Sequence, residues 1–378
     1  MSVNILITIS PSSPDRLRGI AEAAQKRGWH LMVQSRLLHR LDGWSGDGAL
    51  VTVRSEDEIR LVRRLRRKGI PVVDLTIEHP ELRLPRVIGD HAEIGRCSAR
   101  FFADRRFAHI AWFSSDWTHV HALRFGGLCE VWEGEPPIRW VFSQSGSGRR
   151  ADHWPSLVRW LGGQLAAAPK PLAVVTYDDS DAARVEHIAL ARGLAVPEEI
   201  AILGIGNDTL LCENQQVPLS SVRHDTEEAG RRGVALLEEL MSEPHRGAPP
   251  CLLVSPRGVV ERASTDVIAV EDPLLAAALG YISLHLAESF GLAQIADALG
   301  VSPSRIQSAF TAGLQCRVGD EIRRQRLARV RLLLENTTLT VSEIADQTGF
   351  QHLSHLSMLF RKTTGLTPSA WRAAHARQ

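Results

Sequence analysis

Short runs of apolar residues alternate with amphipathic stretches along the first 265 residues of the chain. The segments "NILITIS", "GALVTV", "LAVVTY" and "IAILGIG" are runs of the first kind, and "SEDEIRLVRRLRRKG" and "DAARVEHIALARG" are stretches of the second. Apolar runs between amphipathic helices predict strands that are buried on both faces of a sheet. Because about ten such strands exceed one comfortable sheet, we expect two α/β lobes, each a doubly wound parallel sheet.

The strand pattern stops at "VERASTDVIAVEDP", and helical periodicity alone follows it. We therefore predict an α/β domain over residues 1–266 and an all-α domain over residues 267–378. The expected helices of the second domain span Pro273–His285, Leu292–Leu299, Ser302–Ala312, Val318–Glu335, Val341–Thr348, His352–Thr363 and Pro368–Ala374.

Two segments of the helical part have the shape of a helix-turn-helix, "LAQIADALGVSPSRIQSAF" and "TVSEIADQTGFQHLSHLSMLF". In each, an apolar helix with an alanine at a tight packing position ends at a glycine, Gly300 or Gly349. Glycine takes the left-handed turn conformation without a Cβ penalty. A second amphipathic helix follows the turn, so the sequence predicts two units of this kind.

The composition and the cysteine spacing argue against membrane, secreted and metal-binding proteins. The 378 residues are 44% hydrophobic and 23% charged, as in globular proteins of more than one domain. No apolar run approaches eighteen residues, so no membrane partner is expected. The start "MSVNILITIS" lacks a basic region and a cleavage site, so it is interpreted as a strand. The five cysteines are far apart and form no CxxC pair, so we expect no zinc, no other metal, no cofactor and a cytoplasmic location.

The charge is unevenly distributed along the chain. From Pro273 onward there are 11 lysines and arginines against 7 aspartates and glutamates, whereas the whole chain carries a net charge of only +1. A basic domain on a mildly acidic body indicates an anionic partner at the C-terminal end.

A spaced set of residues occurs in the second unit and the long helix before it. The set consists of the Arg326–Leu327 pair and of Ile344, Ala345, Gly349, Phe350, Phe360, Gly365, Pro368, Trp371 and Arg372. By these residues the helical part resembles the DNA-binding domain of the AraC family of transcription regulators. The resemblance implies two recognition helices about one DNA turn apart, in successive major grooves of double-stranded DNA.

Small and apolar side chains dominate the outward positions of the second recognition helix, so we expect it to prefer thymine methyl groups. The alternative is a solvated surface with no DNA role. The candidate base-contacting residues are Ser304, Arg305, Gln307 and Ser308 on the first recognition helix and Leu353, Ser354, His355, Ser357 and Met358 on the second. Arg361 and Lys362 are the candidate phosphate contacts.

The first unit departs from the family pattern at four positions, which puts its DNA role in question. Thr311 and Ala312 stand where basic residues are usual, Gln315 where glycine is usual, and Glu321 where an aromatic residue is usual.

Five segments occur in this order along the α/β part: "RFGG", "VTYDDSDAA", "IAILGIGND", "LSSVRHD" and "VVERAST". By these segments the α/β part is similar to the effector domain shared by LacI-type repressors and periplasmic sugar-binding proteins. Such a domain joined to an AraC-type DNA-binding domain resembles the regulators of xylose operons. The resemblance implies a two-lobed domain of the periplasmic-binding-protein type that closes on a sugar.

Carboxylates and a guanidinium bind sugar hydroxyls, and aromatic faces pack on sugar rings. By resemblance, Arg124 and Asp179 are sugar contacts, while Gly206 stands where the family usually has an aspartate. Helix capping is the alternative role for the carboxylates, and ordinary core packing for the aromatic residues. The further candidates are Asp15, Asp90 and Trp117, with Trp112 and Phe113 as additional aromatic residues and Asn207 or Asp208 as substitutes for the missing aspartate.

We therefore expect a homodimeric transcription regulator that responds to a small sugar, with RNA polymerase as a candidate further partner. One alternative is a DNA-binding regulator whose effector domain no longer binds a sugar. The other is an α/β enzyme with a helical module, although the sequence shows no convergent set of catalytic residues for it.

Overall fold

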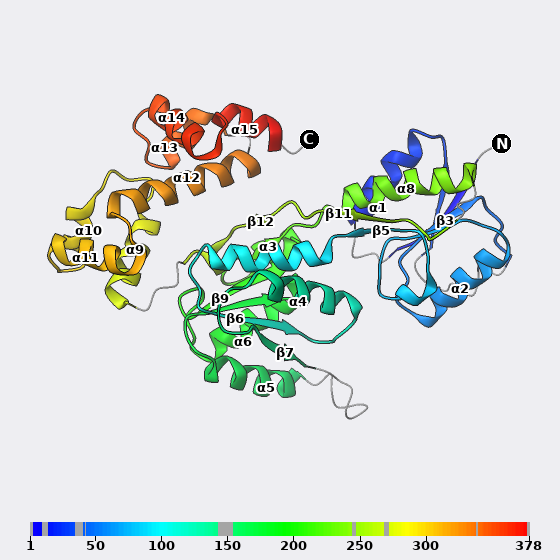
Figure 1. Cartoon of the computed structure of the whole chain (residues 1–378), viewed down its shortest axis with the longest axis horizontal. Helices are drawn as coiled ribbons and strands as arrows, with labels where there is room; N and C mark the ends of the chain where they lie inside the picture. The colour runs from blue at the N-terminus through cyan, green and yellow to red at the C-terminus, as the bar shows by residue number, and fades with distance from the viewer. Residues whose placement is uncertain are drawn as a thin grey trace.

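The computed structural model describes residues 3–9, 14–34, 41, 43–142, 154–243, 247–267, 272–337 and 339–375. Two α/β lobes are followed by a helical part, and the helical part lies beside the second lobe (Figure 1). The predicted fold class is confirmed. None of the helices in the described ranges has the length and apolar character of a membrane span.

The first lobe is built on a six-stranded sheet with the order β11-β5-β4-β3-β1-β2, in which neighbouring strands are parallel. Its strands are β1 (Asn4–Thr8), β2 (His30–Val33), β3 (Gly48–Val51), β4 (Val72–Asp74), β5 (Arg86–Gly89) and β11 (Cys251–Val254). The helical elements of this lobe are α1 (Pro14–Gln25), α2 (Glu56–Arg67), the short 3-10 helix η2 (Pro80–Leu82) and α8 (Thr226–Ser242).

Helices α1 and α8 pack closely against each other on one side of this sheet. At Gly19, an added Cβ would come within 2.0 Å of the Glu227 carbonyl oxygen, so only glycine allows this approach. The two helices are about two hundred residues apart in the sequence, so the first lobe is built from both ends of the α/β part.

The second lobe has the strand order β12-β10-β9-β8-β6-β7, parallel except for the short edge strand β12. Its strands are β6 (His109–Ser114), β7 (Ile138–Val141), β8 (Leu172–Thr176), β9 (Ile200–Ile205), β10 (Ser220–Val222) and β12 (Val259–Val260). Its helical elements are α3 (His91–Ala103), α4 (His119–Val131), α5 (Trp154–Ala167), α6 (Asp179–Ala191), α7 (Thr209–Glu213) and the 3-10 helix η3 (Ala263–Thr265).

Burial on both faces of the sheet explains the apolar runs of the sequence. Trp112 and Phe113 are consecutive on β6 and both are fully buried, yet they belong to separate core clusters. Successive side chains of a strand point to opposite faces, so each residue packs under a different layer of helices. The two aromatic residues considered as a sugar-binding wall are therefore core residues.

The chain crosses between the lobes after β5, after β10 and after β11, so neither lobe is one continuous stretch of sequence. The segments at these crossings include Asp90–His91 and Arg223–Asp225, which follow the carboxyl ends of β5 and β10. Open α/β sheets bind ligands beyond the carboxyl ends of their strands, so these crossings mark the place to look for a site.

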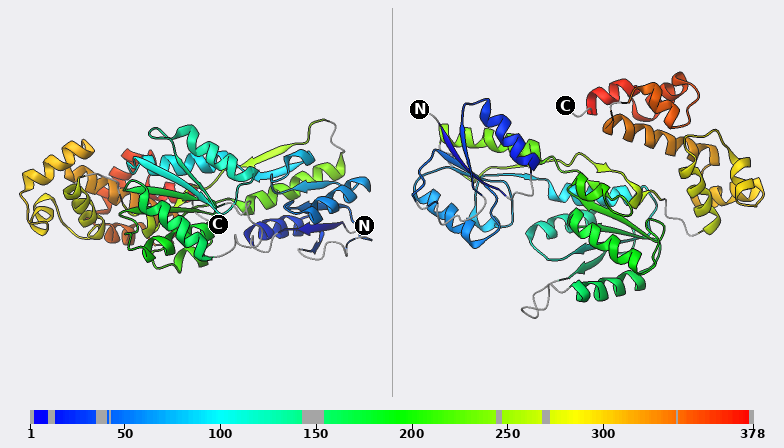
Figure 2. Two further views of the ribbon diagram at one scale, coloured as in Figure 1. Left: turned by 90° about the horizontal axis from the view of Figure 1, so that it is seen from below. Right: turned by 180° about the vertical axis from the view of Figure 1, so that it is seen from behind.

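The helical part consists of two cores joined by one long helix. Figure 2 shows the two groups of helices at opposite ends of α12. One core joins α9, α10, α11 and the start of α12, and the other joins the end of α12 to α13, α14 and α15. The helices are α9 (Pro273–Leu284), α10 (Leu292–Ala298), α11 (Pro303–Leu314), α12 (Val318–Asn336), α13 (Val341–Gln347), α14 (Leu353–Thr364) and α15 (Pro368–His375).

Candidate functional site

A cavity of about 250 Å³ lies between the two lobes. Drug-sized ligands occupy pockets of roughly 300–1,000 Å³, so this cavity suits a ligand of monosaccharide size. Its polar lining comes from both lobes and from the crossings between them. The ionisable lining residues are Arg16, Arg54, Glu78, His91, Arg124, Tyr177, Asp178, His224 and Asp225.

Arg124 of α4 is the most connected side chain of the lining, and only 5% of it is exposed. Its Nη1 donates to the Tyr177 carbonyl oxygen at 2.5 Å, and its guanidinium lies 4.7 Å from the centre of the Tyr177 ring. Its Nε donates to Nδ1 of His91, and its Nη2 faces Nε2 of His224, each at 3.4 Å. Arg124 therefore ties α4 to both of the histidines at the crossings.

The two crossing histidines are neutral. Burial lowers the pKa of His91 and of His224 well below the usual 6.5, and the charge of Arg124 lowers both further. A guanidinium can only donate, so the imidazole nitrogens that face it accept. Each neutral ring carries its proton on the other nitrogen and adds no charge to the cavity.

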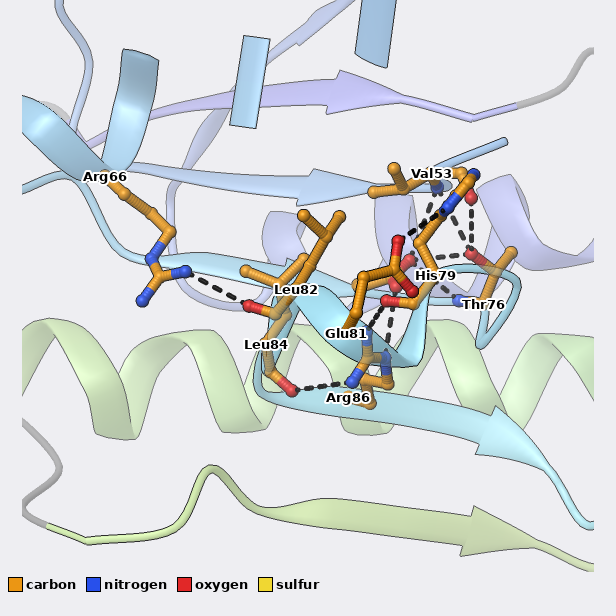
Figure 3. Close-up of polar contacts among 9 residues, drawn as sticks. Val53, Arg66, Thr76, His79, Glu81, Leu82, Leu84 and Arg86 are labelled. Carbon is orange, nitrogen blue, oxygen red and sulfur yellow. Dashed lines mark hydrogen bonds and ion pairs between the residues drawn. The ribbon is translucent and has the colours of Figure 1, made fainter. Parts of the chain in front are cut away.

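The loop between β4 and β5, which brings Glu78 to the cavity, is held by a buried polar network (Figure 3). Arg86 donates from Nη2 to the His79 carbonyl oxygen at 2.6 Å and from Nε to Asp74 Oδ2 at 3.2 Å. Thr76 Oγ1 donates to Asp74 Oδ1 at 2.8 Å. Asp74 and Arg86 are buried together, so this ion pair has a structural role and fixes the loop on both sides of Glu78.

Asp179, expected to contact sugar, does not line the cavity. Its buried carboxylate accepts from Ser221 Oγ at 2.5 Å and from the Asp208 amide at 2.7 Å. Gly206 covers it, and an added Cβ there would lie 3.0 Å from Asp179 Oδ2. The neighbouring Asp178 lines the cavity instead, and it also caps α6.

Three further carboxylates lie at helix starts outside the cavity lining. Asp90 accepts from the Glu93 amide and caps α3, and Asp208 caps α7 in the same way. Asp15 lies in the first turn of α1 and pairs with the exposed Arg18 at 2.8 Å.

Asn207 and Trp117 also lie outside the cavity lining. Asn207 Oδ1 accepts from Arg262 Nη2 at 3.0 Å, and the residue has a φ of 57°. Trp117 packs edge to face on Phe125 at 5.8 Å, with the Arg139 guanidinium 4.9 Å from its ring. Of the seven predicted ligand residues, Arg124 alone lines the cavity.

Most of the polar residues that line the cavity were not predicted from the sequence. Arg16 and His91 directly follow Asp15 and Asp90, and His224 lies inside the quoted segment "LSSVRHD". The signal that identifies them is their position just beyond the carboxyl ends of β1, β5 and β10, where doubly wound sheets bind ligands.

In the second helix-turn-helix, the face expected to read DNA is open. Leu356 and Phe360 of α14 are buried, while 45% of Leu353 and 60% of Met358 are exposed. The other expected contacts of this helix, Ser354, His355, Arg361 and Lys362, are exposed, and Ser357 is half-buried.

In the first unit, Ser304, Arg305 and Ser308 of α11 are exposed, but Gln307 is engaged. Its amide nitrogen donates to Thr311 Oγ1 at 3.2 Å and to the Cys316 carbonyl oxygen at 3.4 Å. Its amide oxygen accepts from the Val318 amide. These bonds direct the Gln307 side chain toward the turn after α11.

The first unit is also attached to the second lobe. Arg106, just beyond the end of α3, donates from its two terminal nitrogens to the carbonyl oxygens of Gly313 and Leu314, each at 3.1 Å. Ser283 of α9 donates to Asp266 Oδ2 at 3.2 Å. His91, the first residue of α3, lines the cavity. Figure 1 shows α3 running from the side of the first lobe toward α9, α10 and α11.

Two family models match the chain. Residues 99–265 match the periplasmic binding protein-like domain, and residues 295–374 match the helix-turn-helix domain. The first match runs from within α3 to the end of η3, so it covers most of the second lobe together with α8 and β11 of the first lobe. The second match runs from α10 to α15 and spans both helix-turn-helix units.

Several regulators of sugar operons are similar to this chain. The xylose operon regulatory protein of Escherichia coli is 23% identical over 373 residues, which cover 94% of this chain and 92% of that protein. The arabinose operon regulatory protein of Escherichia coli is 36% identical over 94 residues, 25% of this chain and 32% of that protein.

A solved structure described as the xylose-binding transcription activator xylR matches the whole architecture. It has a TM-score of 0.65 at 20% identity, and the match covers 100% of this chain and 99% of that chain. The order of the domains and the fold of each are therefore shared with a protein of that description.

Proposed function

We infer that the chain, in which a periplasmic-binding-protein-like domain precedes an AraC-type helix-turn-helix domain, is a DNA-binding transcription regulator that senses a small sugar. The observation that carries this function is the presence, in one chain, of a ligand-sized cavity between two lobes and of two helix-turn-helix units. Relatives named for the xylose and arabinose operons support a monosaccharide effector and control of sugar-catabolism genes.

Ligand binding is proposed to act on the DNA-binding part through α3. A ligand between the lobes contacts both of them, so it favours the closed arrangement of the lobes. His91 at the start of α3 lines the cavity, and Arg106 beyond its end holds the last turn of α11. A shift of α3 on closure would therefore move the first helix-turn-helix unit, which links sugar and DNA affinities reciprocally.

On the DNA side, α14 is proposed as the principal recognition helix. Its exposed Leu353 and Met358 suit thymine methyl groups, and Arg361 and Lys362 suit phosphates. In α11, Ser304, Arg305 and Ser308 are the available contacts, because Gln307 is engaged in internal hydrogen bonds.

The assembly is proposed to be a homodimer, since two-fold pairing is the common state of soluble oligomers and matches paired half-sites in DNA. RNA polymerase is the proposed further partner, and the cytoplasm is the proposed compartment because the chain acts on DNA. The chain is proposed to have no enzymatic role. Within the described part of the chain, no serine, cysteine or lysine side chain lines the cavity.

A gel-shift titration tests this function directly. The full chain is titrated against the DNA that adjoins its own gene, with and without a panel of pentoses and hexoses. We expect specific retention of that DNA and a change in affinity with at least one sugar. The double variant Arg361→Ala/Lys362→Ala serves as a control that should retain ligand binding and lose DNA binding.

Two outcomes would revise the function differently. Specific DNA binding with no sugar effect and no calorimetric sugar binding would leave a regulator whose body does not sense sugars. Sugar turnover by the purified chain would instead support the enzyme alternative.

A further inference from the structure

Three arginines reach the cavity from three different elements. Arg16 comes from the first turns of α1, Arg54 from the segment after β3, and Arg124 from α4 in the other lobe. In the described part of the chain, no carboxylate forms an ion pair with any of these three guanidinium groups. Arg124 and the Nε of Arg16 are buried, whereas Arg54 is exposed at the rim. A buried guanidinium without an anionic partner is costly unless a ligand supplies the negative charge.

Of the three, Arg16 has a buried nitrogen without a partner, since its Nε has no hydrogen-bond partner within the described residues. Burial, followed by the positive charge of Arg54, lowers the pKa of Arg16 to about 10. Arg18, two residues along the same helix, is exposed and pairs with Asp15 at 2.8 Å. Among the described residues, α1 thus places one arginine at the cavity without an ion-pair partner and one outside the cavity with a partner.

Two of the lining carboxylates are occupied by the protein. Asp178 accepts from the Asp181 amide at 2.8 Å as the cap of α6. Asp225 accepts from the Glu228 amide at 3.2 Å and from Arg257 Nε at 2.6 Å. Asp225 is therefore already paired with a cation, and Asp178 is committed to the cap of α6.

Glu78 is the lining carboxylate that remains available to a ligand. Its Oε2 is buried and has no partner among the described residues. A carboxylate in this state accepts hydrogen bonds from hydroxyl groups. The loop that carries it is fixed by Asp74, Thr76 and Arg86, so the acceptor is held in place before a ligand arrives.

The histidines and Gly206 add no negative charge to the lining. His91 and His224 are neutral rings that accept from Arg124, and Arg16 contributes to the lowering of both of their pKa values. Gly206 lines the cavity without a side chain. Three arginines and three carboxylates thus line the cavity, and Glu78 is the carboxylate with a buried oxygen that has no partner among the described residues.

We propose that the effector is a monosaccharide that carries an anionic group, a carboxylate or a phosphate. The inference rests on the proposed function, since it names the class of sugar that the same cavity binds. Arg16 and Arg124, with Arg54 at the rim, bind the anionic group, because guanidinium groups match the geometry of carboxylate and phosphate oxygens. Glu78 accepts hydrogen bonds from the sugar hydroxyls.

Calorimetric titration of the full chain with matched ligands tests the proposal. One set is D-glucose, D-glucuronate and D-glucose 6-phosphate, and the other is D-xylose and D-xylonate. Inorganic phosphate and acetate are added separately to measure binding of an anion alone. We expect at least one anionic sugar to bind at least about tenfold more tightly than its neutral parent, and to weaken as salt is raised.

Two variants of α1 form a matched pair for this titration. Arg16→Gln removes the unpaired guanidinium and should weaken the anionic sugar by at least about tenfold. Arg18→Gln removes an exposed, paired arginine of the same helix and should leave the affinity unchanged. Arg54→Gln provides a second cavity variant at an exposed position, so the test does not depend on Arg16→Gln folding normally.

The outcomes separate this inference from the proposed function. Tighter binding of a neutral sugar than of its anionic counterparts would overturn the anionic assignment and leave sugar sensing intact. No binding by any sugar of either set would overturn both. Equal affinity for inorganic phosphate and for the sugar phosphate would show an anion site without sugar recognition, which also contradicts the proposal.

Discussion

The two helix-turn-helix units have the same backbone plan and different side-chain solutions. The turn glycines Gly300 and Gly349 have φ values of 64° and 71°. The recognition helices then end in the left-handed conformation, at Gln315 with φ 52° in the first unit and at Gly365 with φ 80° in the second. The first unit thus keeps the geometry that favours glycine at its exit but has glutamine there.

The residues that follow the recognition helices and pack against them also differ between the two units. In the second unit, Trp371 packs edge to face on Phe360 at 5.8 Å. At the corresponding place in the first unit, the buried Glu321 accepts two hydrogen bonds from Arg324, at 2.7 and 2.8 Å. The first unit therefore has an ion pair where the second has an aromatic contact, and Glu321 of this pair is buried while Arg324 is exposed.

These differences indicate a division of roles between the units. The second unit carries exposed cations at the end of its recognition helix, whereas the first has Thr311 and Ala312 there. The end of the first recognition helix is instead held by Arg106 of the second lobe. We infer that the second unit supplies most of the DNA affinity and that the first transmits the state of the body.

The largest predicted difference concerns the turn glycines. Positive φ costs an alanine about 1–2 kcal/mol at either position. At Gly349 the added methyl would also meet the Leu286 carbonyl oxygen at 2.4 Å, whereas at Gly300 it would meet open space. Gly349→Ala should therefore cost about 1–3 kcal/mol more than Gly300→Ala. Hydrogen exchange of the full chain, resolved to α11 and α14, measures both, and equal losses would contradict the packing argument.

The next prediction concerns phosphate contacts. Arg361→Ala and Lys362→Ala should each reduce the slope of log affinity against log salt by roughly 0.9, because each removes one released counterion. Thr311→Ala, at the position that corresponds to Arg361, should leave the slope unchanged. Fluorescence anisotropy at several salt concentrations gives the slopes. If Thr311→Ala reduced the slope as much as Arg361→Ala, both units would contribute equally to the phosphate contacts, and the prediction would be wrong.

The smallest predicted effect is a gain of stability. Gln315 is exposed and left-handed, so Gln315→Gly should stabilise the first unit by about 1 kcal/mol through relief of backbone strain. Thermal or urea unfolding of the full chain, followed by exchange in α11, detects the gain. The opposite result, a loss, would show that the glutamine side chain makes a contribution that outweighs the strain.

The order of elements and both helix-turn-helix units were predictable from the sequence because their signals are local. The apolar runs predicted the strands, and Gly300 and Gly349 predicted the turns of the two helix-turn-helix units. The cavity lining was harder to predict from the sequence, because the folded chain brings together residues as distant in sequence as Arg16, Arg124 and His224. Asp179 was predicted to contact the ligand, whereas its neighbour Asp178 lines the cavity. This difference of one position depends on where α6 begins and not on residue type.

We propose that a ligand in the cavity controls DNA binding through the attachment of Arg106 to α11. The measurement is the DNA affinity of the wild-type chain and of Arg106→Ala, each with and without a saturating sugar that binds the cavity. In the wild-type chain, we expect the sugar to change the DNA affinity by a factor within the roughly 5–150-fold range of allosteric coupling. In Arg106→Ala the effect should be lost, while sugar affinity and ligand-free DNA affinity are retained. An undiminished ligand effect in the variant would contradict the proposal.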